Sequence, residues 1–182
     1  MESAYTRREE QSYSKFTEQI PLSPRGEEHA REIAEYFAKE HRIHTIITSG
    51  FVRALQTAEI ISSHTKAQVV VDDRLRERVL CTDELGIETI QNYNQRSLVD
   101  WEWKAPGGES MNEVADRFKG VIDEVLIHTS DVVIVSHSRT IQAYMGKYTK
   151  DTTFEYLSKV PEMLITYGTI LEIPIDTELL KK

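Results

Sequence analysis

The stretch Asp131-Val132-Val133-Ile134-Val135-Ser136-His137 holds the longest aliphatic run of the chain and ends in polar side chains. Four consecutive β-branched residues are typical of a strand that is buried on both faces of a sheet. Helical spacing of apolar residues follows at once, through Ile141, Ala143 and Tyr144. The stretch therefore predicts a buried strand over residues 131–137 that leads directly into a helix, with polar groups at the junction.

The same pattern occurs earlier in the chain. Residues 44–49 are rich in β-branched side chains and are closed by Gly50, which predicts a second buried strand. Apolar residues from Phe51 to Ile61 then recur at helical spacing, so a helix is expected up to about residue 63. Gln68-Val69-Val70-Val71 predicts a further strand.

Two further helices have N-terminal signals in the sequence. Ser23 can accept a hydrogen bond from a free helix amide and Pro24 suits a first helical position, which predicts a helix over about 24–40. Ser110 and Glu113 form a capping box after the turn signal Pro106-Gly107-Gly108, and apolar spacing continues to Val125. Residues 77–105 predict loops with a short helix, and residues 1–19 predict an irregular arm.

The order of these elements determines the expected fold class. Strands alternate with helices, and Tyr167 to Ile175 predicts a last strand. Alternation of this kind favours an α/β domain with a mostly parallel sheet. We find no internal repeat or linker, so residues 1–182 are expected to form a single domain.

Composition excludes several classes of protein. The 182 residues are 40% hydrophobic and 29% charged, which is typical of a globular chain. The net charge of −8 has the wrong sign for binding nucleic-acid phosphates, and no run approaches the roughly 20 apolar residues that span a bilayer. The single Cys81 excludes an internal disulfide and a zinc site built from cysteines, which fits a cytoplasmic location. Neither a nucleic acid nor a membrane is expected as a partner, and the oligomeric state is left open.

Candidate chemical groups stand after three of the predicted strands. Arg53 lies about one turn into the helix after residues 44–49, and His137 lies at the tip of the strand 131–137, beside Ser138. Glu77 lies among Arg74, Arg76 and Arg78. Each group has an ordinary alternative: a surface arginine, a histidine that bonds a turn, and a solvated charge cluster. At the carboxyl ends of parallel strands, the three together favour an anion site.

Other common sites are not supported. His41 and His44 stand at a loop-to-strand junction that would not align them as metal ligands, and no metal site is expected. Ser136 lacks the surrounding glycines of a nucleophile elbow, which argues against a serine hydrolase. Neither of the commonest glycine-rich nucleotide-binding loops occurs, and no cofactor is expected.

Five motifs, in this order, resemble the histidine phosphatase superfamily, which includes the cofactor-dependent phosphoglycerate mutases. The resemblance covers roughly residues 2–175. The motifs read Pro21-Leu22-Ser23-x-x-Gly26, Ser49-x-x-x-Arg53-Ala54-x-Gln56-Thr57-Ala58, Leu75-Arg76-Glu77, Pro106-Gly107-Gly108-Glu109-Ser110 and Val135-Ser136-His137. The resemblance implies a three-layer α/β sandwich and metal-free phosphoryl transfer through a phosphohistidine.

The resemblance also implies roles for individual residues. Arg53 is expected to clamp the phosphate, and His137 to stabilise it as the second histidine, with Ser138 beside it. Glu77 is expected to protonate the leaving oxygen, and for this it must hold a proton near neutral pH. Burial or a nearby phosphate would raise its pKa, whereas arginines that face it would lower the pKa.

The sequence departs from the family at its start. The family opens with a buried strand that ends in Arg-His-Gly, whose histidine is the nucleophile, and Glu2-Ser3-Ala4-Tyr5 resembles the continuation of that motif. The nucleophile would then precede Met1. Two hypotheses follow: either an active phosphatase has a start that is misplaced or truncated here, or the chain is a non-catalytic relative that binds a phosphate ligand.

The sequence thus favours a small phosphatase that acts on a phosphomonoester, with the 182-residue chain itself inactive for want of the nucleophile. A phosphoglycerate mutase is the alternative enzyme. Only about thirty residues separate Glu77 from the turn at Pro106, which favours a compact phosphatase over a mutase with larger insertions.

Overall fold

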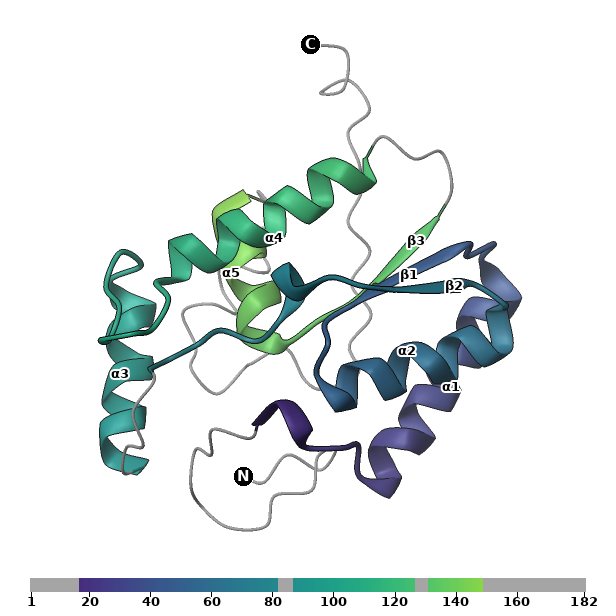
Figure 1. Cartoon of the computed structure of the whole chain (residues 1–182), viewed down its shortest axis with the longest axis horizontal. Coiled ribbons are helices and arrows are strands. Elements are labelled where there is room, and N and C mark those ends of the chain that lie inside the picture. Colours follow the sequence, from purple (N-terminus) through teal and green to yellow (C-terminus); the bar gives the residue numbers. More distant parts are fainter. Residues whose placement is uncertain (1–16, 82–86, 127–130, 149–182) are drawn as a thin grey trace.

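A computed structural model describes residues 17–81, 87–126 and 131–148. The elements follow one another as the short 3-10 helix η1 (Thr17–Gln19), α1 (Pro24–Glu40), β1 (Thr45–Thr48), α2 (Val52–Thr65), β2 (Gln68–Val71), the short 3-10 helix η2 (Asp73–Leu75), α3 (Ile87–Val99), α4 (Met111–Val125), β3 (Val132–Val135) and α5 (Ser138–Tyr148) (Figure 1). The predicted last strand over 167–175 lies outside the described residues.

The described strands form one parallel sheet in the order β2-β1-β3. Thr48 at the end of β1 is in register with Val71 on one side and with Val135 on the other. The residues that follow the three strands therefore leave the sheet at the same edge. This edge carries the candidate groups that the sequence places after strands.

Helices cover both faces of the sheet (Figure 1). On one face, Ile46 of β1 and Val133 of β3 pack in a cluster with residues of α1 and α2, among them Ala34 and Ala58. On the other face, Ile47 of β1 and Ile134 of β3 pack against α4 and α5, in a cluster that includes Phe118 and Tyr144. The structure confirms a three-layer α/β sandwich around a parallel sheet.

The two capped helices begin where the sequence predicts. The Ser23 side chain accepts a hydrogen bond of 3.1 Å from the amide of Gly26, and α1 spans residues 24–40. At α4, the Ser110 hydroxyl accepts from the amide of Glu113 while the Glu113 carboxylate accepts from the amide of Ser110. Both helices are thus fixed at their starts by local chemistry.

Two local predictions need correction. Loops with a short helix were expected between 77 and 105, but α3 is a helix of 13 residues. It is tied down by long-range contacts, since the Tyr93 ring packs edge-on to Trp103 and Arg78 donates to Ser97. Phe51 was expected inside the helix, whereas it is the N-cap residue of α2 and has no side-chain cap bond.

None of the helices in the described part of the chain has the length and apolar character needed to cross a bilayer.

Candidate active site

A buried imidazole joins the ends of two strands. His137 follows β3 and is only 6% exposed. Its Nε2 lies 2.7 Å from the Ser49 hydroxyl, directly after β1, and its Nδ1 lies 3.1 Å from a guanidinium nitrogen of Arg53 in the first turn of α2. The structure therefore brings together Arg53 and His137, which are 84 residues apart in sequence.

The partners of His137 determine its protonation. A guanidinium only donates hydrogen bonds, so Nδ1 is the acceptor and the ring proton lies on Nε2, where it is donated to Ser49. Burial, together with the positive charges of Arg53 and Arg117, holds the pKa of His137 well below its ordinary value. The imidazole is thus neutral at pH 7 and lies beside a fixed cation.

Phe51 forms a wall of this site. Its ring centroid is 4.8 Å from that of His137, and the Arg53 guanidinium carbon lies 5.0 Å from the same ring. Phe51 is 8% exposed. An aromatic ring against both groups restricts water and limits their rotation, so charge interactions in the site are strengthened.

Glu77 lies in the loop after η2 and contacts α5 at the same edge of the sheet. The Glu77 carboxylate accepts a hydrogen bond from the Arg78 amide at 2.8 Å, and its Oε1 lies 3.4 Å from the Thr140 hydroxyl oxygen. Thr140 lies one turn beyond the strand tip that carries His137, and its hydroxyl donates its one proton to the Arg76 carbonyl at 2.8 Å. Glu77 is therefore linked to α5 one turn after His137.

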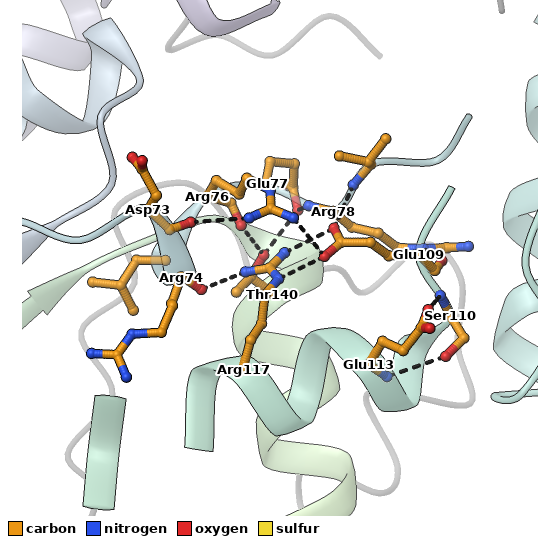
Figure 2. Close-up of polar contacts among 12 residues, drawn as sticks. Asp73, Arg74, Arg76, Glu77, Arg78, Glu109, Ser110, Glu113, Arg117 and Thr140 are labelled. Atoms are coloured by element: carbon orange, nitrogen blue, oxygen red, sulfur yellow. Dashed lines mark hydrogen bonds and ion pairs between the residues drawn. The ribbon is translucent and has the colours of Figure 1, made fainter. Parts of the chain in front are cut away.

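The three arginines around Glu77 in the sequence are directed to other acceptors. Arg74 pairs with Asp72 and Glu124. Arg76 pairs with Glu109 at 2.9 Å, and Arg78 donates to the Glu109 carbonyl (Figure 2). Arg78 also donates to the Ser97 hydroxyl.

Ser138 is the first residue of α5 and is half-buried. It stands next to His137 at a helix N-terminus, the position at which backbone amides favour an anion. Its role in phosphate binding remains a prediction. Among the residues that the structure describes, no group of three or more metal-ligating side chains converges.

Sequence reasoning missed four residues of this region, namely Ser49, Thr140, Glu109 and Arg117. Each contacts a segment far away in the chain, which spacing along the sequence does not show. Ser49 and Glu109 do lie inside motifs that carry the family resemblance. The signal that could have found Glu109 is charge balance, because three arginines over residues 74–78 require acceptors.

Residues 5–165 match the sequence profile of the histidine phosphatase superfamily, branch 1. The chain belongs to the histidine phosphatase superfamily. Among curated members, it is 33% identical over 125 residues to the probable phosphoglycerate mutase GpmB of Serratia proteamaculans and 36% identical to that of Escherichia coli. Each alignment covers 64% of this chain and 58% of the relative, so the chain matches less than two thirds of those proteins.

Solved structures show the same superfamily fold. A mycobacterial glucosyl-3-phosphoglycerate phosphatase is 25% identical, with a TM-score of 0.66 over 87% of this chain and 78% of that chain. A second structure, titled mycobacterial hydrolase 2, is 26% identical, with a TM-score of 0.67 over 87% of this chain and 70% of that one. Both phosphatase-named and mutase-named proteins of the histidine phosphatase superfamily are therefore similar to this chain.

Proposed function

We propose that the protein is a phosphomonoester phosphatase of the histidine phosphatase type. The observation that carries this proposal is the contact of 3.1 Å between the half-buried Arg53 and the buried His137 at the carboxyl edge of the parallel sheet. A guanidinium can bind two phosphate oxygens at once, and the imidazole N–H, which is donated to Ser49 in this structure, turns to a phosphate oxygen in the proposed complex. Superfamily membership and a phosphatase among the similar structures support the same reaction.

The proposed roles follow from the charges of phosphoryl transfer. Arg53, His137 and Ser138 stabilise the negative charge on the transferred phosphoryl oxygens. The bond from phosphorus to the ester oxygen breaks while a bond to the histidine nucleophile forms, and Glu77 gives its proton to the departing oxygen. Water then attacks the phosphohistidine, Glu77 takes a proton from that water, and inorganic phosphate leaves.

The nucleophile in this proposal precedes Met1. The six histidines of the chain are all preceded by residues other than arginine, so the 182 residues contain no Arg-His-Gly. We therefore propose that the active protein has an apolar strand ending in Arg-His before Met1 and that the 182-residue chain alone is inactive. Translation of the DNA upstream of Met1 tests this directly. A stop codon or unrelated residues would instead favour a non-catalytic protein that binds a phosphate ligand.

A mutase is the second candidate, because the curated relatives described above are named probable phosphoglycerate mutases. A mutase returns the phosphoryl group to another hydroxyl of the substrate instead of to water. Incubation with a monophosphoglycerate distinguishes the two, since a phosphatase releases inorganic phosphate and a mutase yields the isomeric phosphoglycerate.

The proposed substrate is a small phosphorylated molecule. The net charge of −8 repels anions at long range, so attraction of phosphate must come from the site itself. We also propose that the reaction needs no metal and takes place in the cytoplasm. Activity that persists in EDTA would support the metal-free mechanism.

A further inference from the structure

A second polar cluster lies beside the candidate active site and has no role in the reaction proposed above. It centres on Glu109, between the turn at Gly107 and the start of α4, and it faces the loop that carries Glu77 (Figure 2). The Glu109 side chain is 15% exposed. Such a sheltered carboxylate needs several hydrogen-bond partners, and the structure supplies them from three segments.

The Glu109 carboxylate binds two guanidinium groups and one amide. Arg76 donates to Oε1 at 2.9 Å, and Arg117 of α4 donates to Oε1 at 2.9 Å and to Oε2 at 3.2 Å. The Val79 amide donates to Oε2 at 3.0 Å. Burial alone would raise the pKa of Glu109, but the bonds from Arg117 and Val79 and the charges of both arginines hold it below its usual value. Glu109 is therefore a carboxylate at neutral pH.

Backbone contacts join the same two segments. The Glu109 amide donates to the Val79 carbonyl at 2.8 Å, and the Arg78 side chain donates to the Glu109 carbonyl at 2.9 Å. A Cβ on Gly108 would lie 2.2 Å from the Leu80 carbonyl oxygen, so only glycine permits this approach. The residues on both sides of Glu77 are thus bonded to Glu109, through Arg76 on one side and through Arg78 and Val79 on the other.

Thr140 limits the remaining freedom of the loop. Its hydroxyl contacts both the Arg76 carbonyl and the Glu77 carboxylate, and Thr140 itself is fully buried in α5. Glu109 holds the loop from the side of α4, while Thr140 holds it from the side of α5. A proton donor that is misplaced by about 1 Å can lose on the order of 100-fold in rate.

We propose that Glu109 is a positioning residue that fixes the loop 76–79 and so aims the Glu77 carboxyl at the leaving oxygen. This inference rests on the proposed phosphatase function. Glu109 binds neither Glu77 nor His137 in the structure, so its effect must pass through the loop. A loss of positioning should therefore slow the step that needs a proton and should spare the binding of phosphate.

The leaving group of the substrate tests this proposal. p-Nitrophenolate departs readily without a proton, whereas the alkoxide of β-glycerol phosphate requires one. In the full-length protein, Glu109→Gln should lower kcat/KM for β-glycerol phosphate at least about tenfold more than kcat/KM for p-nitrophenyl phosphate, because kcat/KM reports the departure of the ester oxygen and not the later hydrolysis that both esters share. KM should change less than about twofold, and Glu77→Gln should show the same pattern more strongly.

Glu113→Gln is the matched control. Glu113 stands four residues after Glu109 in the sequence, is exposed, and pairs with Lys104. This variant should leave the ratio of the two activities unchanged. Thr140→Val removes the second support of the loop and should give the same larger loss of activity on β-glycerol phosphate. It is the test to use if Glu109→Gln does not fold. Equal losses for both esters, or none, would overturn the positioning role alone. A full-length protein that hydrolyses neither ester would overturn the proposed function and this inference with it.

Discussion

A guanidinium nitrogen of Arg53 lies 3.1 Å from Nδ1 of the buried His137, although the two residues stand on different elements. The cation occupies the acceptor nitrogen of the ring, so the other nitrogen carries the proton and donates to Ser49. Arg53 therefore fixes the orientation of the imidazole, and its charge adds to burial in lowering the pKa of the ring. These two effects make Arg53 the residue whose removal disturbs the site most directly.

Replacing Arg53 should weaken phosphate stabilisation. In the full-length protein, Arg53→Ala should lower kcat/KM by about 10- to 150-fold, because a charge-assisted contact contributes about 1.5–3 kcal/mol. Arg53→Lys keeps the charge but loses the planar pair of donors, so it should recover only part of this loss. Activity of Arg53→Ala within about twofold of wild type would contradict the site described above.

Stability should depend on pH through His137. Burial, with Arg53 and Arg117, holds the pKa of the folded imidazole well below its ordinary value of 6.5. The unfolded chain takes up a proton near that pH while the folded protein does not. The free energy of unfolding should therefore fall as the pH drops below about 6.5, by up to about 1.4 kcal/mol per pH unit from this group.

Urea titrations at pH 7 and pH 5 measure this effect. Carboxylates contribute their own pH dependence, so the comparison is with His137→Gln, which removes the imidazole and leaves the other groups in place. Wild type should lose more stability than His137→Gln between the two pH values. Parallel losses in both proteins would show that His137 titrates normally in the fold.

Two glycines should respond to alanine in opposite directions. A Cβ at position 108 would meet the Leu80 carbonyl oxygen at 2.2 Å, whereas a Cβ at position 120, inside α4, would meet only the end of the Arg74 side chain at 3.5 Å. Gly108→Ala should destabilise the protein by about 1–3 kcal/mol or more. Gly120→Ala should stabilise it by about 0.5–1 kcal/mol, because alanine favours the helix. Thermal unfolding of the two variants checks both signs.

Sequence patterns were sufficient where local chemistry determines the element. Ser23 with Pro24, and Ser110 with Glu113, satisfy free amides within one turn, and α1 and α4 begin at the predicted residues. The runs of β-branched residues predicted β1, β2 and β3, of which β1 and β3 pack between two helical layers while β2 leaves Val70 and Val71 exposed. These local features were therefore enough to predict the α/β class.

The remaining features depend on contacts between distant segments. α3 is fixed by the Trp103 ring and by the bond from Arg78 to Ser97. Arg53 and His137 were predicted as separate candidates, but their direct contact and the role of Ser49 arise only when β1 and β3 pair. The arginines beside Glu77 could equally have faced it. In the folded chain, Arg76 pairs with Glu109, and Arg74 pairs with both Asp72 and Glu124.

The release of inorganic phosphate from a phosphomonoester by the full-length protein, in EDTA, tests the central claim most directly. Wild type should turn over the ester, and His137→Gln should reduce kcat at least about 100-fold, because the proposed reaction needs the histidine N–H to leave Ser49 and bind the transferred phosphoryl group. Release that His137→Gln leaves unchanged, or phosphate binding by wild type without any turnover, would contradict a phosphatase that works through this site.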